Sequence, residues 1–489
     1  RYILLFFNFE LNKNEPVYIQ IKNYIEDLIT KGLLPINSKL PSTRELCSIL
    51  NVSRNSVLSA YEELKTEGLV YSIKGQGTFV KEQSSVRTSS WNVDWSLYEN
   101  EYTKNVNKMD SSKNEITWKS NLISFKSISP AGDQFDMEEL KRAFLNRFNL
   151  EGHKLLNYGY AQGYKPLIEF LIQYMNKKNV DSTNKDILVT NGFTEALNII
   201  ISSLTKPGDY ILCENPTHNV SLKIFKSYNL NILPMNLDKN NLDFESINDT
   251  LKKYKGKIKF VYITPSYNNP TGIVLSPEDR FKFYNIMKEN NIAIIEDGFN
   301  EELLYSSSHI FPICSLDNKN NGVIYIGSFS KILFPGMRIG WIFGDKNLVD
   351  RLVSVKRSIN MHVSFLDQGI LYDYLKNSNF DKYLKKIRKY YGDKFNFALQ
   401  CANKYIDYEY VLGDGGLHLF FKLKDIDTRY LLQKCYEKGV IFMPGDVFFI
   451  NENQNNFMRL GFSRLEKDEI EKGIKIIGET IDEIKKSVL

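Results

Sequence analysis

The chain has 489 residues, of which 43% are hydrophobic and 25% charged, and its formal net charge is +5 at pH 7. This length predicts two or three domains, and the composition is that of a soluble globular protein. The mild charge implies that any contact with nucleic acid is local. No apolar run approaches the roughly 20 residues of a membrane span, and residues 1–7 are too short for a signal peptide. Residues can be missing before Arg1, because the chain does not begin with Met.

The five cysteines are scattered along the chain without the spacing of metal ligands. They are most simply buried thiols in a reducing compartment. We therefore expect a cytoplasmic protein that holds no metal ion.

Residues 12–80 are predicted to form a small domain with three helices. The first covers 17–32, where apolar residues recur at helical spacing and a glycine ends the helix. The second begins at a capping box formed by Ser42 and Glu45. The third covers 54–67 and is followed by another glycine.

The second and third helices, joined by a tight turn, match a helix-turn-helix, in which the start of the second helix of the motif reaches base edges in the major groove. That helix is capped by Ser53 and opens with Arg54, Asn55 and Ser56. Arg54 can bind guanine, and Asn55 can bind adenine or a phosphate. Two short strands around the glycines of 74–77 predict a β-wing. A helical bundle for protein contacts is the alternative, which the positive charges at groove-facing positions disfavour.

Three motifs, LPSTREL at 40–46, VSRNSV at 52–57 and GQGTFV at 75–80, closely resemble the winged helix of GntR-type bacterial repressors. The resemblance implies that this domain binds double-stranded operator DNA. It implies DNA contacts by Arg44, Ser53, Arg54 and Asn55, with Lys74 and Gly75 on the wing. Leu58 departs from an arginine found in some relatives, which puts one base contact in doubt.

Residues 81–120 are predicted to connect this domain to the rest of the chain. Residues 81–90 are polar and rich in serine, which is typical of a linker. Aromatic and apolar residues follow (Trp95, Leu97 and Tyr98), and they can dock on a neighbouring domain. The pattern leaves open whether this part is a tether or a first helix.

Five short apolar runs alternate with helical patterns in residues 121–489, which predicts an α/β body with a mostly parallel sheet wrapped by helices. Ligands of such sheets bind beyond the carboxyl ends of the strands. The residues that follow each run are therefore the candidates for a site. The runs are Ile187–Val189, Tyr210–Leu212, Phe260–Ile263, Ile292–Ile295 and Val323–Ile326.

Residues after the first four runs suit different parts of a phosphorylated pyridine aldehyde. A helix start offers free N–H groups to a phosphate, a flat ring can stack on a pyridine, an amide can donate to a phenolic oxygen, and a carboxylate can keep the ring nitrogen protonated. In chain order these groups are Gly192, Phe193 and Thr194 at a helix start, the ring of His218, the amide of Asn269 and the carboxylate of Asp297.

The stretch after the fifth run, residues 328–341, supplies the remaining groups. Lys331 offers an amine for a Schiff base. Ser328, Ser330 and Arg338 can hold a phosphate. Each group alone can be a turn residue, a surface charge or a satisfied core residue, but their coincidence at the strand ends favours pyridoxal 5'-phosphate as the cofactor.

Residues 123–489 resemble a fold-type I, pyridoxal-phosphate-dependent aminotransferase, which implies a large domain built on the sheet and a smaller α+β C-terminal domain. The motif YGYAQGY at 158–164 resembles the loop whose tyrosine, here Tyr158, reaches the phosphate in the neighbouring subunit. This implies a homodimer. The motif MRLGFS at 458–463 resembles the segment whose arginine, here Arg459, binds an amino-acid carboxylate.

Two residues depart from the aminotransferase pattern. Phe299 replaces a tyrosine that donates to the phenolic oxygen of the cofactor, and His218 replaces a larger aromatic ring. Without the phenol, we expect the imine to keep its proton to higher pH, with Asn269 as the remaining donor. Efficient transamination is less assured for the same reason.

A GntR-type winged helix joined to an aminotransferase-like body is the layout of the MocR family of bacterial transcription regulators, which this chain resembles. The resemblance implies a regulator that binds DNA and senses pyridoxal phosphate or an amino-acid-like effector. An active aminotransferase with an autoregulatory DNA-binding head is the alternative. A DNA-binding scaffold with an inactive body is a third possibility.

Overall fold

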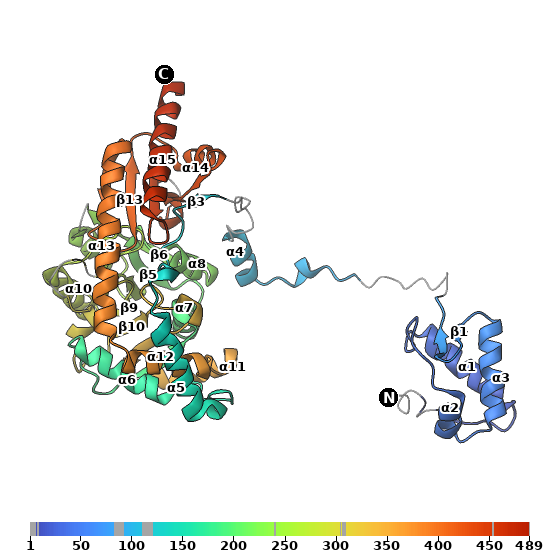
Figure 1. The fold of residues 1–489 in the computed structure, drawn as a ribbon. Helices are drawn as coiled ribbons and strands as arrows, with labels where there is room; N and C mark the ends of the chain where they lie inside the picture. Colours follow the sequence, from blue (N-terminus) through green and yellow to red (C-terminus); the bar gives the residue numbers. More distant parts are fainter. Residues whose placement is uncertain are drawn as a thin grey trace. The chain divides into compact units, whose positions relative to one another are not determined.

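The computed structural model describes residues 6, 9–82, 92–109, 121–238, 241–303, 305, 310–451 and 454–488. The chain forms two compact units, Arg1–Tyr98 and Glu99–Leu489, whose elements are labelled in Figure 1. Each unit is described by itself.

The part of the first unit at residues 12–80, called the head from here on, combines helices with a two-stranded antiparallel sheet, as the sequence predicts. The Ser42 hydroxyl accepts from the backbone N–H of Glu45 (3.2 Å), and the Glu45 carboxylate accepts from the N–H of Ser42 (3.3 Å), which confirms the predicted capping box. Asn51 ends the second helix in the left-handed conformation (φ 52°), which asparagine tolerates. The elements are α1 Val17–Thr30, α2 Thr43–Leu50, α3 Arg54–Thr66, β1 Val70–Ile73 and β2 Gly77–Val80.

The connector contains a helix that belongs to the second unit. Helix α4 (Glu101–Met109) packs against α8 (Asn219–Ser227). The aromatic side chain that docks is Tyr102, because its ring lies 5.3 Å from that of Tyr228. Trp95, Leu97 and Tyr98 belong to the first unit, in which they are 72%, 80% and 73% exposed. Residues 83–91 and 110–120 lie outside the described residues.

The body is built on an eight-stranded mixed sheet with the order β4-β11-β10-β9-β8-β5-β6-β7. All five predicted runs are strands, and β10, β9, β8, β5 and β6 run parallel, whereas β11 lies antiparallel between β4 and β10. The bounds are β4 Lys185–Thr190, β5 Tyr210–Asn215, β6 Asn231–Asp238, β7 Asn241–Leu242, β8 Ile258–Ile263, β9 Ala293–Asp297, β10 Val323–Ser328 and β11 Gly340–Asp345.

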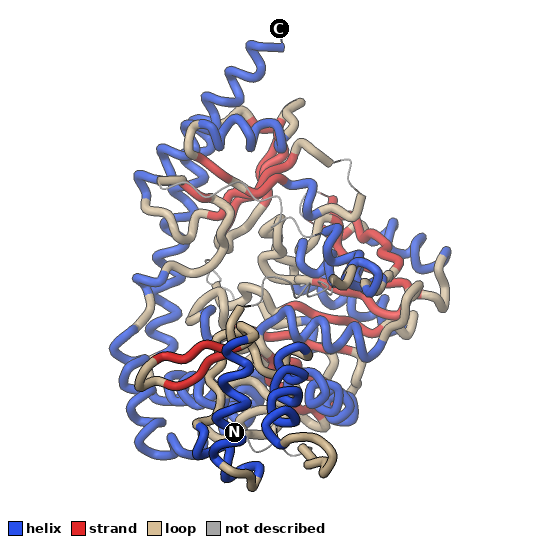
Figure 2. Tube along the Cα trace, turned by 90° about the vertical axis from the view of Figure 1, so that its right-hand side faces the viewer, coloured by secondary structure: helices blue, strands red, loops and turns tan. Residues whose placement is uncertain are grey.

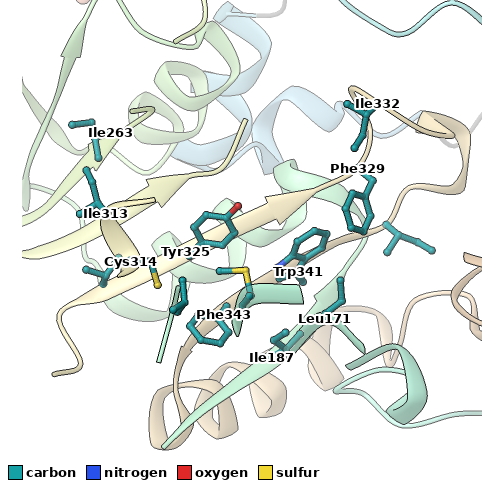
Figure 3. Packing of buried hydrophobic residues seen from close by; sticks show 14 of the residues in the cluster. Leu171, Ile187, Ile263, Ile313, Cys314, Tyr325, Phe329, Ile332, Trp341 and Phe343 are labelled. Carbon is teal, nitrogen blue, oxygen red and sulfur yellow. The ribbon is translucent and has the colours of Figure 1, made fainter. Parts of the chain in front are cut away.

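Both faces of the sheet are buried, which explains the continuous apolar runs. Along β10, Tyr325 packs into the core on one face while Ile324 and Ile326 pack into the core on the other. Tyr325, Trp341 and Phe343 lie in the larger core, and Phe329 just beyond β10 anchors the chain to it (Figure 3). The strand end that precedes Lys331 is therefore held firmly.

Helices cover both faces of the sheet (Figure 2). On one face pack α7 Gly192–Leu204, α8 and α11 Lys346–Asn360. On the other face pack α5 Met137–Leu155, α6 Lys165–Lys177, α9 Phe244–Lys253, α10 Pro277–Glu289, α12 Phe365–Asn377 and the first half of α13 Phe380–Tyr405.

The second half of α13 packs into a separate C-terminal core, which is the predicted smaller α+β domain. Its four-stranded sheet has the order β12-β13-β16-β15, and the short parallel pair β3-β14 lies beside it. The bounds are β3 Ile123–Ser124, β12 Tyr408–Leu412, β13 His418–Leu423, α14 Thr428–Glu437, β14 Val440–Ile441, β15 Met443–Pro444, β16 Phe457–Gly461 and α15 Lys467–Val488.

Candidate functional site

A cavity of about 210 Å³ lies at the carboxyl ends of β9 and β10. Eight of the eleven residues that we predict for the cofactor line it, whereas Gly192, Asn269 and Tyr158 do not. The lining residues are Phe193, Thr194, His218, Val220, Asp297, Gly298, Phe299, Asn300, Ile326, Ser328, Ser330, Lys331 and Arg338.

One end of the cavity is equipped for a phosphate. The Ser328 hydroxyl donates to the Ser330 hydroxyl (2.8 Å) and accepts from the Ser330 backbone N–H (3.1 Å), so both hydroxyls lie together. Arg338 reaches the start of α7, where its Nη2 donates to the carbonyl of Asn191 (3.4 Å). A Cβ added at Gly192 would lie 2.5 Å from that Nη2, and Gly192 has a φ of +75°, so this position requires glycine.

A buried carboxylate also lines the cavity. Asp297 ends β9 and accepts from the hydroxyl of Tyr262 (2.7 Å). Burial raises the pKa of Asp297 to about 7, although the hydrogen bond from Tyr262 opposes this rise. Lys331 is a nearby positive charge, but no ion pair joins it to Asp297 among the described residues, so a cationic ring nitrogen in the cavity would pair with this carboxylate.

Tyr262 is a site residue that the sequence does not reveal, because it lies inside an apolar strand run and looks like a core aromatic. Its hydroxyl also accepts from Ser221 (3.1 Å), and the Ser221 hydroxyl is 3.3 Å from Nδ1 of His218. Burial, together with the charge of Lys331, lowers the pKa of His218 to about 3. His218 is therefore neutral, as a ring that stacks on a pyridinium requires.

The amine of Lys331 lies 5.5 Å from the centre of the Phe299 ring. Burial, together with the nearby charge of Arg459, lowers the pKa of Lys331 to about 8, although Asp297 opposes the shift. About one tenth of the amine is neutral at pH 7 with such a pKa, compared with less than a thousandth for an ordinary lysine. Lys331 is therefore available as a nucleophile near neutral pH.

Arg459 is buried on β16, with 5% of its surface exposed. Its Nη1 donates to Oδ1 of Asn269 (2.7 Å) and its Nη2 to the carbonyl of Lys126 (2.9 Å). The guanidinium stacks on Phe448 (4.9 Å), and its Nε has no hydrogen-bond partner among the described residues. Burial lowers the pKa of Arg459, which shows how strongly this site would favour an anion.

The tyrosine that we predict to reach the phosphate of a neighbouring subunit faces outward. Tyr158 is 83% exposed and Tyr160 is 78% exposed. The loop itself is anchored, because the N–H of Gly159 donates to Nε2 of His362 (3.1 Å). Neither tyrosine approaches the cavity of its own chain.

The predicted DNA-contacting residues lie on the surface of the head. Arg44, Arg54 and Asn55 are exposed, and so are Lys74 and Gly75 in the turn between β1 and β2. The hydroxyls of the two predicted serines serve the helix start, since Ser53 accepts from the N–H of Ser56 (3.1 Å) and the two hydroxyls lie 2.8 Å apart.

Comparison with known proteins assigns the two units. The model of aminotransferase class I and II matches residues 120–477, and the model of bacterial regulatory proteins of the gntR family matches residues 17–80. The chain belongs to the class I and II aminotransferase family. It joins this body to a gntR-type head, which confirms the combination that the sequence predicts.

Named relatives fall into two groups. Aromatic-amino-acid aminotransferase 1 of Thermococcus litoralis is 30% identical over 74% of this chain and 89% of its own length. The HTH-type transcriptional regulator NorG of Staphylococcus aureus is 28% identical over 87% of this chain and 95% of its own length. An uncharacterized HTH-type transcriptional regulator of Bacillus subtilis, YdfD, is 27% identical over 96% of this chain and 98% of its own length.

Solved structures agree with the assignment of the body. A multiple substrate aminotransferase from Thermococcus profundus superposes with a TM-score of 0.74 at 28% identity, over 81% of this chain and all of that chain. Pyrococcus horikoshii kynurenine aminotransferase, solved in complex with PMP, superposes with a TM-score of 0.71 at 28% identity, over 82% of this chain and 98% of that chain.

Pyridoxal 5'-phosphate is the cofactor of this family, and the cavity fits it. The cavity lining contains the phosphate-binding candidates Ser328, Ser330 and Arg338, the carboxylate of Asp297 and the amine of Lys331, and the Arg338 guanidinium lies against Gly192, where no side chain would fit. Among the described residues, no helix is long and apolar enough to cross a membrane.

Proposed function

We propose that this protein is a cytoplasmic transcription regulator whose head (12–80) binds double-stranded operator DNA and whose body (121–489) senses an amino compound through pyridoxal phosphate. Residues 81–120 connect the two. One observation carries the proposal: a single chain combines a gntR-type head with a cavity lined by residues that can bind a phosphate, a pyridine nitrogen and an aldehyde.

Pyridoxal phosphate, when bound, supplies an aldehyde that bonds covalently to amines and a protonated ring that withdraws electrons. Lys331 supplies the amine, and its lowered pKa provides the neutral form at physiological pH. Asp297, held by Tyr262, favours a proton on the ring nitrogen. Ser328, Ser330 and Arg338 hold the phosphate.

Arg459 selects the effector in this proposal. Its buried guanidinium keeps the unpartnered Nε and stacks on Phe448, which suits a planar carboxylate. An amino acid or a related amino carboxylate would place its carboxylate at Arg459 and its amine at Lys331. An effector that favours one arrangement of the body changes the affinity for DNA if DNA also favours one arrangement, and DNA then changes the affinity for the effector by the same factor.

We place the protein in a homodimer. Tyr158 and Tyr160 are exposed, and the loop that carries them is held in place by a hydrogen bond to His362. Exposed aromatic side chains on an ordered loop are the kind of residue that a partner covers. Sedimentation of the purified protein, compared with a Tyr158→Ser/Tyr160→Ser variant, tests this step.

An electrophoretic or anisotropy assay on DNA upstream of the gene tests the regulatory function. Wild type with cofactor is expected to bind one DNA segment, and added amino carboxylates are expected to change that affinity. Lys331→Ala is expected to keep DNA binding but lose the response. If the response to amino compounds survives Lys331→Ala unchanged, the sensing proposal is wrong.

An active aminotransferase is the second candidate, because Lys331, Asp297 and Arg459 are all present and relatives with that activity match the body. Prolonged incubation with amino and keto acids separates the two functions. Many turnovers per site favour the enzyme, whereas a spectral change that stops after one equivalent favours the sensor.

A further inference from the structure

Asn300 carries an amide that is buried in the cofactor cavity without a partner. The residue lines the cavity and is 2% exposed, and neither its Nδ2 nor its Oδ1 has a hydrogen-bond partner among the described residues. Leaving a buried polar group unpaired costs about 1–3 kcal/mol. A group placed in this cavity without a protein partner indicates a ligand that pairs with it.

Each polar group of the cofactor but one already has a partner in the cavity lining. The phosphate is matched by Ser328, Ser330 and Arg338, the ring nitrogen by Asp297 and the aldehyde by Lys331. The phenolic oxygen remains. Among the other described lining residues, Phe193, Val220, Phe299 and Ile326 are apolar, Gly298 has no side chain, His218 is the candidate stacking ring, and Thr194 belongs to the helix start of α7 that can bind a phosphate.

The two neighbouring candidates for this oxygen are less suited to it. Phe299 has no donor, and its ring lies beneath the amine of Lys331. Asn269 does not line the cavity, and its Oδ1 accepts from Arg459 (2.7 Å), so only its Nδ2 remains to donate, and the phenolic oxygen can accept from a second donor. Asn300 follows Phe299 directly, with a positive φ of 57° that asparagine tolerates better than most residues.

We propose that Nδ2 of Asn300 donates a hydrogen bond to the phenolic oxygen of bound pyridoxal phosphate, the role that Phe299 cannot fill. This inference rests on the cofactor site of the proposed function. A donor at this oxygen stabilises negative charge beside the Lys331 linkage. The bound cofactor would therefore lose a proton at lower pH than if Asn269 acted alone.

The test is a pH titration of the visible absorption of the protein–cofactor complex, without any substrate. Asn300→Gly is the best variant, because glycine accepts the positive φ and removes only the amide. We expect Asn300→Gly to raise the spectral midpoint by about one to two pH units, since a lost hydrogen bond to a charged group disfavours the charged form roughly ten- to hundred-fold. Asn300→Asp, which replaces the donor with a carboxylate, is expected to raise it further.

A second substitution checks that the effect acts at the phenolic oxygen. Phe299→Tyr restores a phenol donor beside the cavity, so Phe299→Tyr/Asn300→Gly is expected to recover most of the midpoint shift. Asn290→Ala, at an exposed residue after α10, is the matched control and is expected to leave the midpoint unchanged. Thermal unfolding of each variant reports whether the fold is retained.

The outcomes separate this inference from the proposed function. If wild type does not bind pyridoxal phosphate at all, the cofactor site itself is wrong. If wild type binds it and Asn300→Gly leaves the midpoint within about 0.2 units, only the role of Asn300 is wrong. A variant that keeps the midpoint but loses affinity for amino carboxylates also overturns the inference, because Asn300 would then contact the effector.

Discussion

Replacing Asp297 with asparagine is expected to stabilise the cofactor-free body at alkaline pH. Asp297 is 5% exposed, and its folded-state pKa, about 7, lies above the ordinary value of 3.8. Below pH 3.8 the carboxyl is protonated in both states and carries no penalty. As pH rises, the unfolded chain ionises first, so folding becomes less favourable until the folded carboxyl also ionises above about pH 7.

The magnitude follows from the difference between the two pKa values. A shift of about three units corresponds to roughly 4 kcal/mol at pH 8, but only to about 1.7 kcal/mol at pH 5. Asparagine avoids ionisation and can still accept from Tyr262. The stability advantage of Asp297→Asn over wild type is therefore expected to grow by about 2.5 kcal/mol between pH 5 and pH 8.

Thermal unfolding of the cofactor-free protein at a series of pH values measures this advantage. Glu289→Gln removes an exposed carboxyl at the end of α10 and is the control. Its unfolding temperature is expected to change with pH in the same way as that of wild type. Added pyridoxal phosphate is expected to make wild type more stable than Asp297→Asn, because its protonated ring nitrogen would pair with the carboxylate. The reasoning is refuted if the wild-type and Asp297→Asn curves stay parallel across this pH range.

Three further predictions concern the cofactor amine and the head. Borohydride reduction after brief exposure to pyridoxal phosphate should label Lys331, faster as pH rises toward 8 where its neutral form increases; labelling that is unchanged in Lys331→Ala would contradict this. Lys74→Ala should weaken binding to all DNA sequences and reduce the slope of log Kd against log salt concentration by about one. Arg54→Ala should instead relax the base preference at one position of the operator. Equal effects of the two variants would be inconsistent with these roles. Ser42→Ala should lower the free energy of unfolding of the head by about 1 kcal/mol, because the capping box is lost. Denaturant unfolding of the full chain measures this change. Ser59→Ala, at an exposed serine, is the control and is expected to keep the stability of wild type.

The head was readable from sequence because its signals are local. Ser42 with Glu45, and Ser53 with Ser56, are pairs three residues apart, so their hydrogen bonds can be inferred from spacing alone. The strand-end groups were readable for a related reason. Parallel strands place their carboxyl ends at one edge, so Asp297 and Lys331 could be expected in one cavity although 34 residues separate them.

Other features depend on contacts that no local pattern specifies. Tyr262 donates to Asp297 across 35 residues, and Arg459 donates to Asn269 across 190. The position of β11 between β4 and β10 follows from tertiary packing, as does the contact of Tyr102 with Tyr228. The orphaned amide of Asn300 becomes visible only when every neighbouring donor and acceptor is placed.

The docking of α4 gives helix α8 two separate attachments. His218, which lines the cofactor cavity, is the N-cap of α8, and Tyr228 and Asn229 follow its last residue. Asn229 accepts from Asn105 of α4 (2.7 Å). An α-helix of nine residues is about 13 Å long and rigid. A displacement of His218 that moved α8 as a rigid body would therefore also move Tyr228 and Asn229, the two residues that contact α4.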